Sequence, residues 1–391
     1  MIRKLKIFRT VLVVIFCGLG CVATSHVTPL HPAAVIRVAL MKSAPQVTLR
    51  IRGEYTISDP TTRDVLSAGR GTVRVRADTT DKKIFVGSQE FPLSRIRIEA
   101  RRYIALFIDG KQRRFRGCLE LIQNPDQSLL VVNHLHIEDY IRGVLYHEVS
   151  HRWPLEAIKA QAVATRTYAL YHKKANAERP YDVTNDIYSQ VYGGRTSEHY
   201  RTNLAVERTR DEVLVFQGEL IPAYFHATCG GHTENASRLW NHAPLVPLSG
   251  VPCIYCGHSP HFFWTAVMAR KDLHQELRDY GLSLQSVQDM RIIERNDSGR
   301  IAALEIIDDQ NRSVTVSGKE FRSMIGPNKI KSNNYRLQFD GEQVIFTGRG
   351  WGHGVGLCQW GAQQMAAQRH DYRAILQYYY PGTQIEKQVY R

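Results

Sequence analysis

The chain has 391 residues but few cysteines and, after its first thirty residues, no long apolar run. A membrane-spanning helix needs about 20 consecutive apolar residues, so no such helix is expected in the body of the chain. Glycine (28 residues) and proline (15) are not enriched, which excludes a collagen-like or low-complexity chain. A hydrophobic content of 43% suffices for a globular core. The length predicts two to three domains of about 150 residues each.

Several common catalytic motifs are also absent. The sequence has neither the nucleophile elbow of α/β-hydrolases nor the His-Glu-x-x-His helix of zinc proteases. The glycine-rich loop at 348–356 lacks the Lys-Ser/Thr that follows a phosphate-binding loop, so a nucleotide is not its expected ligand. Cys358, beside Leu357 and Gln359-Trp360, is expected to be a small buried residue and not a nucleophile.

The N-terminus has the pattern of a targeting segment. Basic residues at positions 3, 4, 6 and 9 precede an apolar stretch over 11–22 and then Ala23-Thr24-Ser25. This pattern predicts a secretory signal peptide over residues 1–23, and therefore a periplasmic or cell-envelope protein. An uncleaved anchor, or acylation at Cys21, is the alternative. Membrane contact is expected only through this segment.

The chain carries an excess of positive charge. Lys and Arg number 51 against 37 Asp and Glu, a formal net charge of +14, of which residues 1–23 supply four. An exported protein of this charge would be attracted to anionic envelope polymers, and salt would screen the attraction. Because the chain is expected to be exported, nucleic acid is not an expected partner.

Residues 24–130 form a predicted β-rich region. Short segments with alternating and β-branched residues recur at 36–40, 47–52, 72–76, 95–99 and 129–132, and Ile108-Asp-Gly-Lys111 has the pattern of a hairpin turn. Six basic residues flank that turn. They could form a solvated strand face or a surface for an anionic wall polymer, and the sequence leaves both open.

The pattern changes to helical spacing at His136. Apolar residues predict a short helix over 137–148 and a longer one opened by Pro154, with strands and turns following through residue 227. Beyond it, 271–280 reads as a charged helix and 301–307 and 313–316 as strands. The fold class is therefore α+β, a mixed sheet with short helices in residues 131–391 after the β-rich N-terminal region.

Three residues have neighbours that suggest chemistry. Glu148 ends the short helix among apolar residues, where burial would raise its pKa as a catalytic acid requires, although a glutamate at a helix end is usually on the surface. Arg166, among small residues, could bind an anionic group or be a surface residue. His353 lies in the glycine-rich loop, which could approach a ligand closely or form a structural turn.

Five cysteines remain outside the signal, an odd number for an oxidising compartment. Cys253 and Cys256 have the spacing of a zinc knuckle, and Cys229 with His258 could complete a tetrahedral site. The alternative is a disulfide between Cys229 and Cys253 or Cys256.

Three blocks of sequence together resemble the stage II sporulation protein D family (SpoIID) with its amidase-enhancer relatives. They are 137–149 with 153–169, 189–194 with 223–235, and 352–362 with 380–382, and in order they extend over about residues 130–385. Some relatives carry zinc-binding cysteines just before the Gln-Val-Tyr segment, where this chain has Thr184 and Ser189, so that metal site is not expected here.

The resemblance implies a lytic transglycosylase that cleaves the MurNAc–GlcNAc bond of peptidoglycan, preferably in denuded glycan strands, and leaves 1,6-anhydro-MurNAc ends. It implies that a cleft holds the glycan and that Glu148 is catalytic. No cofactor is expected to be required, and a structural zinc at the cysteine group remains open beside the disulfide. The implied substrate-binding residues are Arg166, Gln190, Tyr192, His353 and Gln359.

Two alternatives remain. A non-catalytic glycan-binding module could recruit or enhance a cell-wall amidase, which would be its partner. A hydrolase could use Asp182 or Glu234 as the second carboxylate that ordinary glycosidases need.

Overall fold

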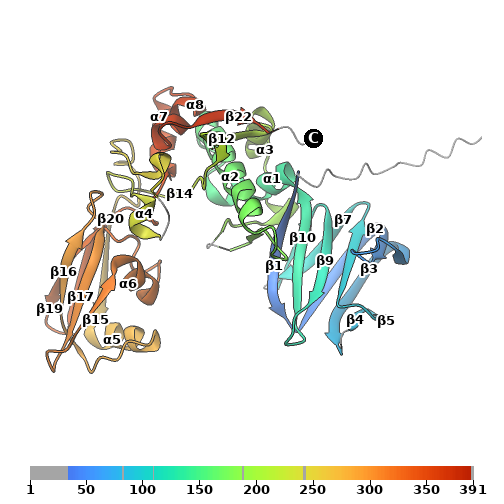
Figure 1. The fold of residues 1–391 in the computed structure, drawn as a ribbon, viewed down its shortest axis with the longest axis horizontal. Coiled ribbons are helices and arrows are strands. Elements are labelled where there is room, and N and C mark those ends of the chain that lie inside the picture. The colour runs from blue at the N-terminus through green and yellow to red at the C-terminus, as the bar shows by residue number, and fades with distance from the viewer. Residues whose placement is uncertain (1–33, 82, 109, 187–188, 241–243, 389–391) are drawn as a thin grey trace, which may run out of the picture.

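The structure, a computed structural model, describes residues 34–81, 83–108, 110–186, 189–240 and 244–388 (Figure 1). The predicted signal segment lies outside the described residues. The described part combines mixed sheets with helices and a β-rich N-terminal region, which confirms the predicted α+β class. No helix in this part of the chain is long and apolar enough to cross a membrane.

An eleven-stranded sheet forms the N-terminal part, and its order is β11-β1-β10-β9-β6-β2-β3-β4-β5, with β7 on β2 and β8 on β7. The strands are β1 Val35–Ala44, β2 Gln46–Ser58, β3 Val65–Thr80, β4 Lys83–Val86, β5 Gln89–Phe91, β6 Arg95–Ala100, β7 Tyr103–Ile108, β8 Lys111–Phe115, β9 Cys118–Gln123, β10 Leu129–His136 and β11 Val183–Thr184. The predicted strands and the hairpin at 108–111 are confirmed. The predicted division at residue 130 falls inside β10.

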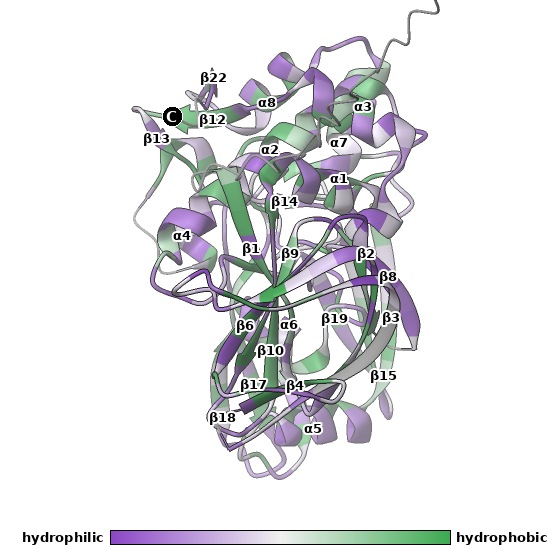
Figure 2. Cartoon of the chain, turned by 90° about the vertical axis from the view of Figure 1, so that its right-hand side faces the viewer, coloured by the Kyte–Doolittle hydropathy of each residue, from purple (hydrophilic) through white to green (hydrophobic). Residues whose placement is uncertain are grey.

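Alternation along these strands builds the first hydrophobic core. In β1, Ile36 and Val38 are fully buried, and their faces pack with β10 and with Ile141 and Val144 of helix α1, Ile137–Glu148. Figure 2 shows how β1 and β10 are largely hydrophobic. The sheet is therefore the platform on which α1 lies, and α1 starts directly after β10.

A helical layer follows the sheet and carries the second core. Its helices are α2 Leu155–Ala175, α3 Tyr200–Arg208, α4 Ala236–Leu239, α7 Gln359–Ala367 and α8 Tyr372–Tyr379. Its short strands are β12 Glu212–Phe216, β13 Glu219–Leu220 and β22 Gln384–Lys387 in one sheet, and the parallel pair β14 Phe225–His226 and β21 Leu357–Cys358. The helices predicted over 137–148 and after Pro154 are present as α1 and α2, but Pro154 is the residue directly before the first helical residue of α2 and not that residue itself.

Residues 263–349 form a unit inserted in this layer, with a third core of its own. It contains β15 Phe263–Ala269, α5 Arg270–Asp279, β16 Val287–Arg295, β17 Ile301–Asp308, β18 Ser313–Ser317, α6 Gly318–Ile325, β19 Tyr335–Asp340 and β20 Gln343–Arg349. Phe263, the first residue of the unit, pairs with Arg349, its last, so the chain enters and leaves the unit at the same place. In Figure 1 this unit lies at the opposite end of the molecule from the N-terminal sheet.

Candidate active site

A cleft of about 370 Å³ opens where the end of α1 meets the start of α7 and the glycine-rich loop before it. It is lined by Tyr146, His147, Glu148, Val149, Ser150, Trp153, Ala227, His261, Trp351, Gln359 and Trp360. Glu148 is the one carboxylate among these residues, and no lysine or arginine lines the cleft.

Glu148 is the last residue of α1, and its carboxylate has two weak donors. Its Oε1 accepts from the Val191 backbone N–H at 3.3 Å and its Oε2 from Gln359 Nε2 at 3.4 Å. Burial raises the pKa of Glu148 from 4.5 to about 7, and the two donors only partly oppose this shift. The negative end of the helix dipole acts in the same direction as burial. The carboxyl is therefore poised to hold or release a proton near neutral pH.

Gln359 and Glu148 come together although 211 residues separate them in the sequence. Gln359 is the first residue of α7 and is largely buried, and its amide also lies 3.4 Å from the Gln161 oxygen of α2. Of the five substrate-binding residues expected from the sequence, Gln359 is the one that lines the cleft.

Gln190 and Tyr192 do not reach the cleft, which corrects the expectation that they bind substrate. Both are about 1% exposed. The Tyr140 hydroxyl donates to Gln190 Oε1 at 2.9 Å, and the Tyr192 hydroxyl donates to Asn133 at 2.9 Å. These bonds anchor the backbone on both sides of Val191, so the pair positions the N–H that reaches Glu148.

The expectation that Arg166 binds substrate is also wrong, because Arg166 is a structural residue of the core. Its side chain is fully buried, and it donates to both carboxylate oxygens of Glu138, at 2.8 and 2.7 Å. A third bond goes to the Glu212 carbonyl at 2.9 Å. The guanidinium therefore ties α2 to α1 and β12, and it has no surface left for a ligand.

His353 is not among the residues that line the cleft and is held by backbone on both ring nitrogens, which corrects its expected role in substrate binding too. Its Nε2 donates to the Phe225 carbonyl at 2.9 Å, and its Nδ1 accepts from the Val355 N–H at 3.1 Å. Burial is the main reason that its pKa falls to about 3, so the ring is neutral. The glycines that flank it do take positive φ, as expected, with Gly354 at 91°.

Aromatic residues of the cleft wall are the group that sequence reasoning missed. The Trp153 and Trp360 rings meet edge to face at 5.2 Å, and the Trp351 ring meets His261 at 4.5 Å. Trp351 lies in the glycine-rich loop, and Trp360 directly follows Gln359. Their positions within this motif are the sequence signal that could have identified them as residues of the cleft. Such rings offer flat apolar surfaces of the kind that stack on sugars.

Neither alternative second carboxylate lies in the cleft. Asp182 is 1% exposed and pairs with Arg37 at 2.6 Å. Glu234 is equally buried and accepts from Ser298 at 2.7 Å and Asn296 at 2.8 Å. A two-carboxylate hydrolase is therefore disfavoured.

The cysteine cluster has a different membership from the one expected. The sulfurs of Cys229, Cys253, Cys256 and Cys358 all lie within 4.8 Å of one another, buried, and could hold a metal ion. His258 is not part of the cluster, because its Nε2 bonds to Gln363 at 2.8 Å on the surface. All five cysteines of the described residues are free thiols, so the rival disulfide is not formed here.

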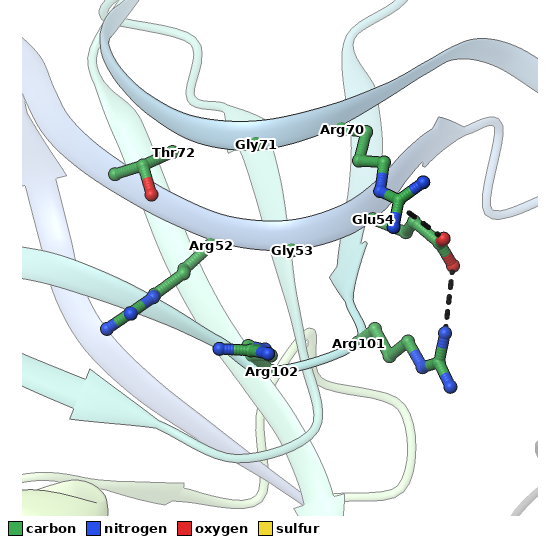
Figure 3. A pocket seen from close by; sticks show the side chains of 8 residues that line it. All are labelled: Arg52, Gly53, Glu54, Arg70, Gly71, Thr72, Arg101 and Arg102. Atoms are coloured by element: carbon green, nitrogen blue, oxygen red, sulfur yellow. Dashed lines mark hydrogen bonds and ion pairs between the residues drawn. The ribbon is translucent and has the colours of Figure 1, made fainter.

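A second hollow lies on the N-terminal sheet, between β2, β3 and the turn after β6 (Figure 3). Arginines 52, 70, 101 and 102 surround it, and Glu54 pairs with Arg70 and Arg101 at 3.8 and 3.4 Å. Within the described chain, Arg52 and Arg102 form no salt bridge. The hollow is basic and exposed, which suits an anionic ligand and not acid catalysis.

Comparison with known proteins agrees with the motifs. Residues 125–216 match the family model described as stage II sporulation protein (SpoIID), and residues 256–356 match a domain of unknown function, DUF8618, which covers the inserted unit and seven residues on each side of it.

Three relatives illustrate the similarity. An uncharacterized protein of Brachyspira hyodysenteriae is 41% identical over 69% of this chain and 72% of its own length. Stage II sporulation protein D of Bacillus subtilis is 30% identical over 66% of this chain and 76% of its own. The amidase enhancer of Bacillus subtilis is 29% identical over 62% of this chain, but this covers only 40% of that protein. With this identity and coverage, the chain belongs to the stage II sporulation protein D family.

Proposed function

We propose that the cleft binds a peptidoglycan glycan strand and that the protein is a lytic transglycosylase cleaving the MurNAc–GlcNAc bond. The observation that carries this proposal is the single cleft carboxylate, Glu148, with a pKa raised to about 7. Ordinary glycosidases need two carboxylates, whereas a cyclising transglycosylase needs one, because the muramyl C6 hydroxyl is its nucleophile.

Glu148 would act twice in this reaction. Its protonated carboxyl gives the proton to the glycosidic oxygen as the C1–O bond breaks, and the resulting carboxylate then takes the proton of the C6 hydroxyl as that oxygen bonds to C1. The products are a 1,6-anhydro-MurNAc end and a free GlcNAc hydroxyl, and no water is consumed. Because the nucleophile belongs to the substrate, proximity contributes up to about 7–11 kcal/mol when it is well oriented.

Substrate recognition would rest on stacking and on hydrogen bonds. Trp153, Trp351 and Trp360 supply ring faces, and Gln359 and Ser150 supply polar groups. With no cation in the lining, nothing there would attract the stem peptides, which agrees with a preference for denuded strands.

The substrate implies where the protein works. We propose that it is exported through residues 1–23 and acts in the periplasm or cell envelope, either released or anchored by that segment. A cell-wall amidase, which denudes glycan strands, would be its functional partner.

The test is mass spectrometry of purified glycan, intact and amidase-treated, after incubation with wild-type protein and with Glu148→Gln. We expect anhydro-muramyl products from the wild type alone, mainly from amidase-treated glycan. Reducing ends in place of anhydro ends, or cleavage by Glu148→Gln, would refute the assignment.

A second candidate is a glycan-binding module that enhances an amidase, and the name of the amidase-enhancer relative favours it. It predicts no cleavage of either glycan by folded protein, but faster peptide release when an amidase is added. In that case Glu148→Gln would stimulate the amidase as well as the wild type does, whereas tryptophan substitutions in the cleft would not.

A further inference from the structure

The four-cysteine cluster has the size of a mononuclear metal site. Its sulfurs lie within 4.8 Å of one another, with Cys229 and Cys256 Sγ 3.4 Å apart. Zinc bonds thiolate sulfur at about 2.3 Å, which places the sulfurs of a tetrahedral site about 3.8 Å apart. The four residues come from three segments distant in sequence: the loop after β14, the Cys253-x-x-Cys256 turn and the end of β21.

Hydrogen-bond donors point at the sulfurs as they do around bound thiolates. The Cys229 backbone N–H donates to Cys358 Sγ at 3.3 Å, and the Tyr379 hydroxyl lies 3.2 Å from Cys253 Sγ. Gly230, with φ of 80°, turns its own N–H toward Cys256. Such outer contacts orient metal ligands and stabilise their charge.

A buried cation beside the cluster is the independent observation. Arg300, from the inserted unit, is fully buried, and its guanidinium donates to the carbonyls of Cys229 at 2.6 Å and His232 at 2.9 Å. Among the described residues it forms no ion pair, and the acidic groups that act on it are the cluster residues Cys229, Cys358 and Cys256 and the buried carboxylate of Glu234. Arginine stays charged, and burying an uncompensated charge is costly. Four thiolates around a divalent cation carry a net charge of −2, which compensates Arg300 together with the carboxylate of Glu234.

We propose that Cys229, Cys253, Cys256 and Cys358 bind one zinc ion as a structural tetrathiolate, with Arg300 as its charge partner. The ligand set replaces His258 by Cys358, and it lies apart from the positions of Thr184 and Ser189. Those two residues bond to each other at 3.0 Å instead.

The ion would fix the wall of the cleft. Cys358 directly precedes Gln359, which donates to Glu148, and the Trp360 N–H donates to the Ala227 carbonyl at 3.1 Å, two residues before Cys229. Zinc therefore ties both segments of this wall together and holds Gln359 against the carboxylate.

Elemental analysis of the full chain tests the site without any activity assay. We expect one zinc per chain in the wild type, released by a mercurial thiol reagent from the folded protein. Cys256→Ser should lose at least nine-tenths of the metal, while Cys118→Ser, which changes the buried cysteine outside the cluster, and His258→Ala should retain it. The mercurial release needs no variant, so a failure of Cys256→Ser to fold leaves the test intact.

Charge compensation has its own test. Arg300→Met should weaken zinc retention about 10–100-fold against a chromogenic chelator, whereas Arg336→Met, at an exposed site in β19 of the same unit, should not. Wild-type protein without metal, iron in place of zinc, retention by Cys256→Ser, or recovery of the four cysteines as disulfides after alkylation without reductant would each overturn the zinc assignment.

Discussion

At the scale of single residues, the ionisation of Glu148 makes the activity depend on pH. The proposed reaction starts from the protonated carboxyl, and burial raises its pKa to about 7. We expect kcat/KM for anhydro-product formation to fall as pH rises through about 7, tenfold per unit at the steepest. Gln359→Leu removes a donor to the carboxylate and should move this alkaline limb upward by about half a unit. A profile that stays flat from pH 6 to 9 would contradict the acid role.

The same residue should limit stability. Because folding raises the pKa of Glu148, its carboxyl does not change the free energy of unfolding below pH 4.5, where it is protonated in both the folded and the unfolded state. As the pH rises from 4.5 to 7, it lowers the free energy of unfolding increasingly. Glu148→Gln removes this cost, so thermal unfolding should show it to be more stable than wild type by about 1–3 kcal/mol at pH 8 and equal at pH 4.5. Glu178→Gln, at an exposed site, is the control and should show no such gain.

Arg166 should affect stability and not substrate affinity. It is buried in a two-point ion pair with Glu138, and removing one partner of such a pair costs about 3–5 kcal/mol. Arg166→Met should therefore lower the unfolding midpoint, and the double variant with Glu138→Leu should recover part of the loss. A raised KM at unchanged stability would instead restore the substrate-binding role.

These two residues show what the sequence could predict about the site. The apolar neighbours of Glu148 are local in sequence, so its desolvation could be inferred. The partner of Arg166 is 28 residues away and that of Gln359 is 211 away, and no periodicity places such pairs. The family motifs therefore identified important residues, but they could not tell a residue that lines the cleft, such as Gln359, from one that supports the fold behind it, such as Arg166.

At the scale of elements, the Gln190–Tyr192 segment holds the C-terminal end of α1 in place through the bond from Val191 to Glu148. Tyr192→Phe removes the bond to Asn133 inside the core and leaves that acceptor unpaired, which should cost about 1–3 kcal/mol. Because Val191 then holds Glu148 less firmly, kcat should fall while KM changes little. Denaturant unfolding and steady-state kinetics on the same preparation separate the two effects. Tyr181→Phe, at a half-buried position outside the segment, is the control.

The elements themselves were largely predictable because their signals are local. Alternating residues predicted β1, β2 and β6, and helical spacing predicted α1 with nearly the observed bounds and the start of α2. The inserted unit was not predicted as a unit, because its boundary is made by the pairing of Phe263 with Arg349, a contact between positions far apart in sequence. Likewise, Cys358 joins the cysteine cluster only through the pairing of β21 with β14.

At the scale of the whole molecule, the basic hollow and the cleft lie on different parts of the fold. The hollow belongs to the N-terminal sheet and the cleft to the helical layer. The hollow would attract a wall polymer electrostatically, whereas the cleft would bind it by stacking on aromatic rings. Attraction by exposed arginines is screened by salt, whereas stacking on tryptophans is not.

Binding to intact peptidoglycan, which carries anionic stem peptides, should therefore weaken strongly between about 50 and 500 mM NaCl, as the screening length drops below about 10 Å. Binding of a short denuded oligosaccharide should hardly change. At low salt, replacing Arg52 and Arg102 together by Gln should weaken binding to intact peptidoglycan as added salt does. Trp360→Ala should weaken only the binding of the oligosaccharide. Sedimentation with sacculi and calorimetry with oligosaccharide measure the two. Sacculus binding that is indifferent to both salt and the arginine changes would show that the N-terminal sheet has another role, because its positive charge would then contribute nothing to holding the wall.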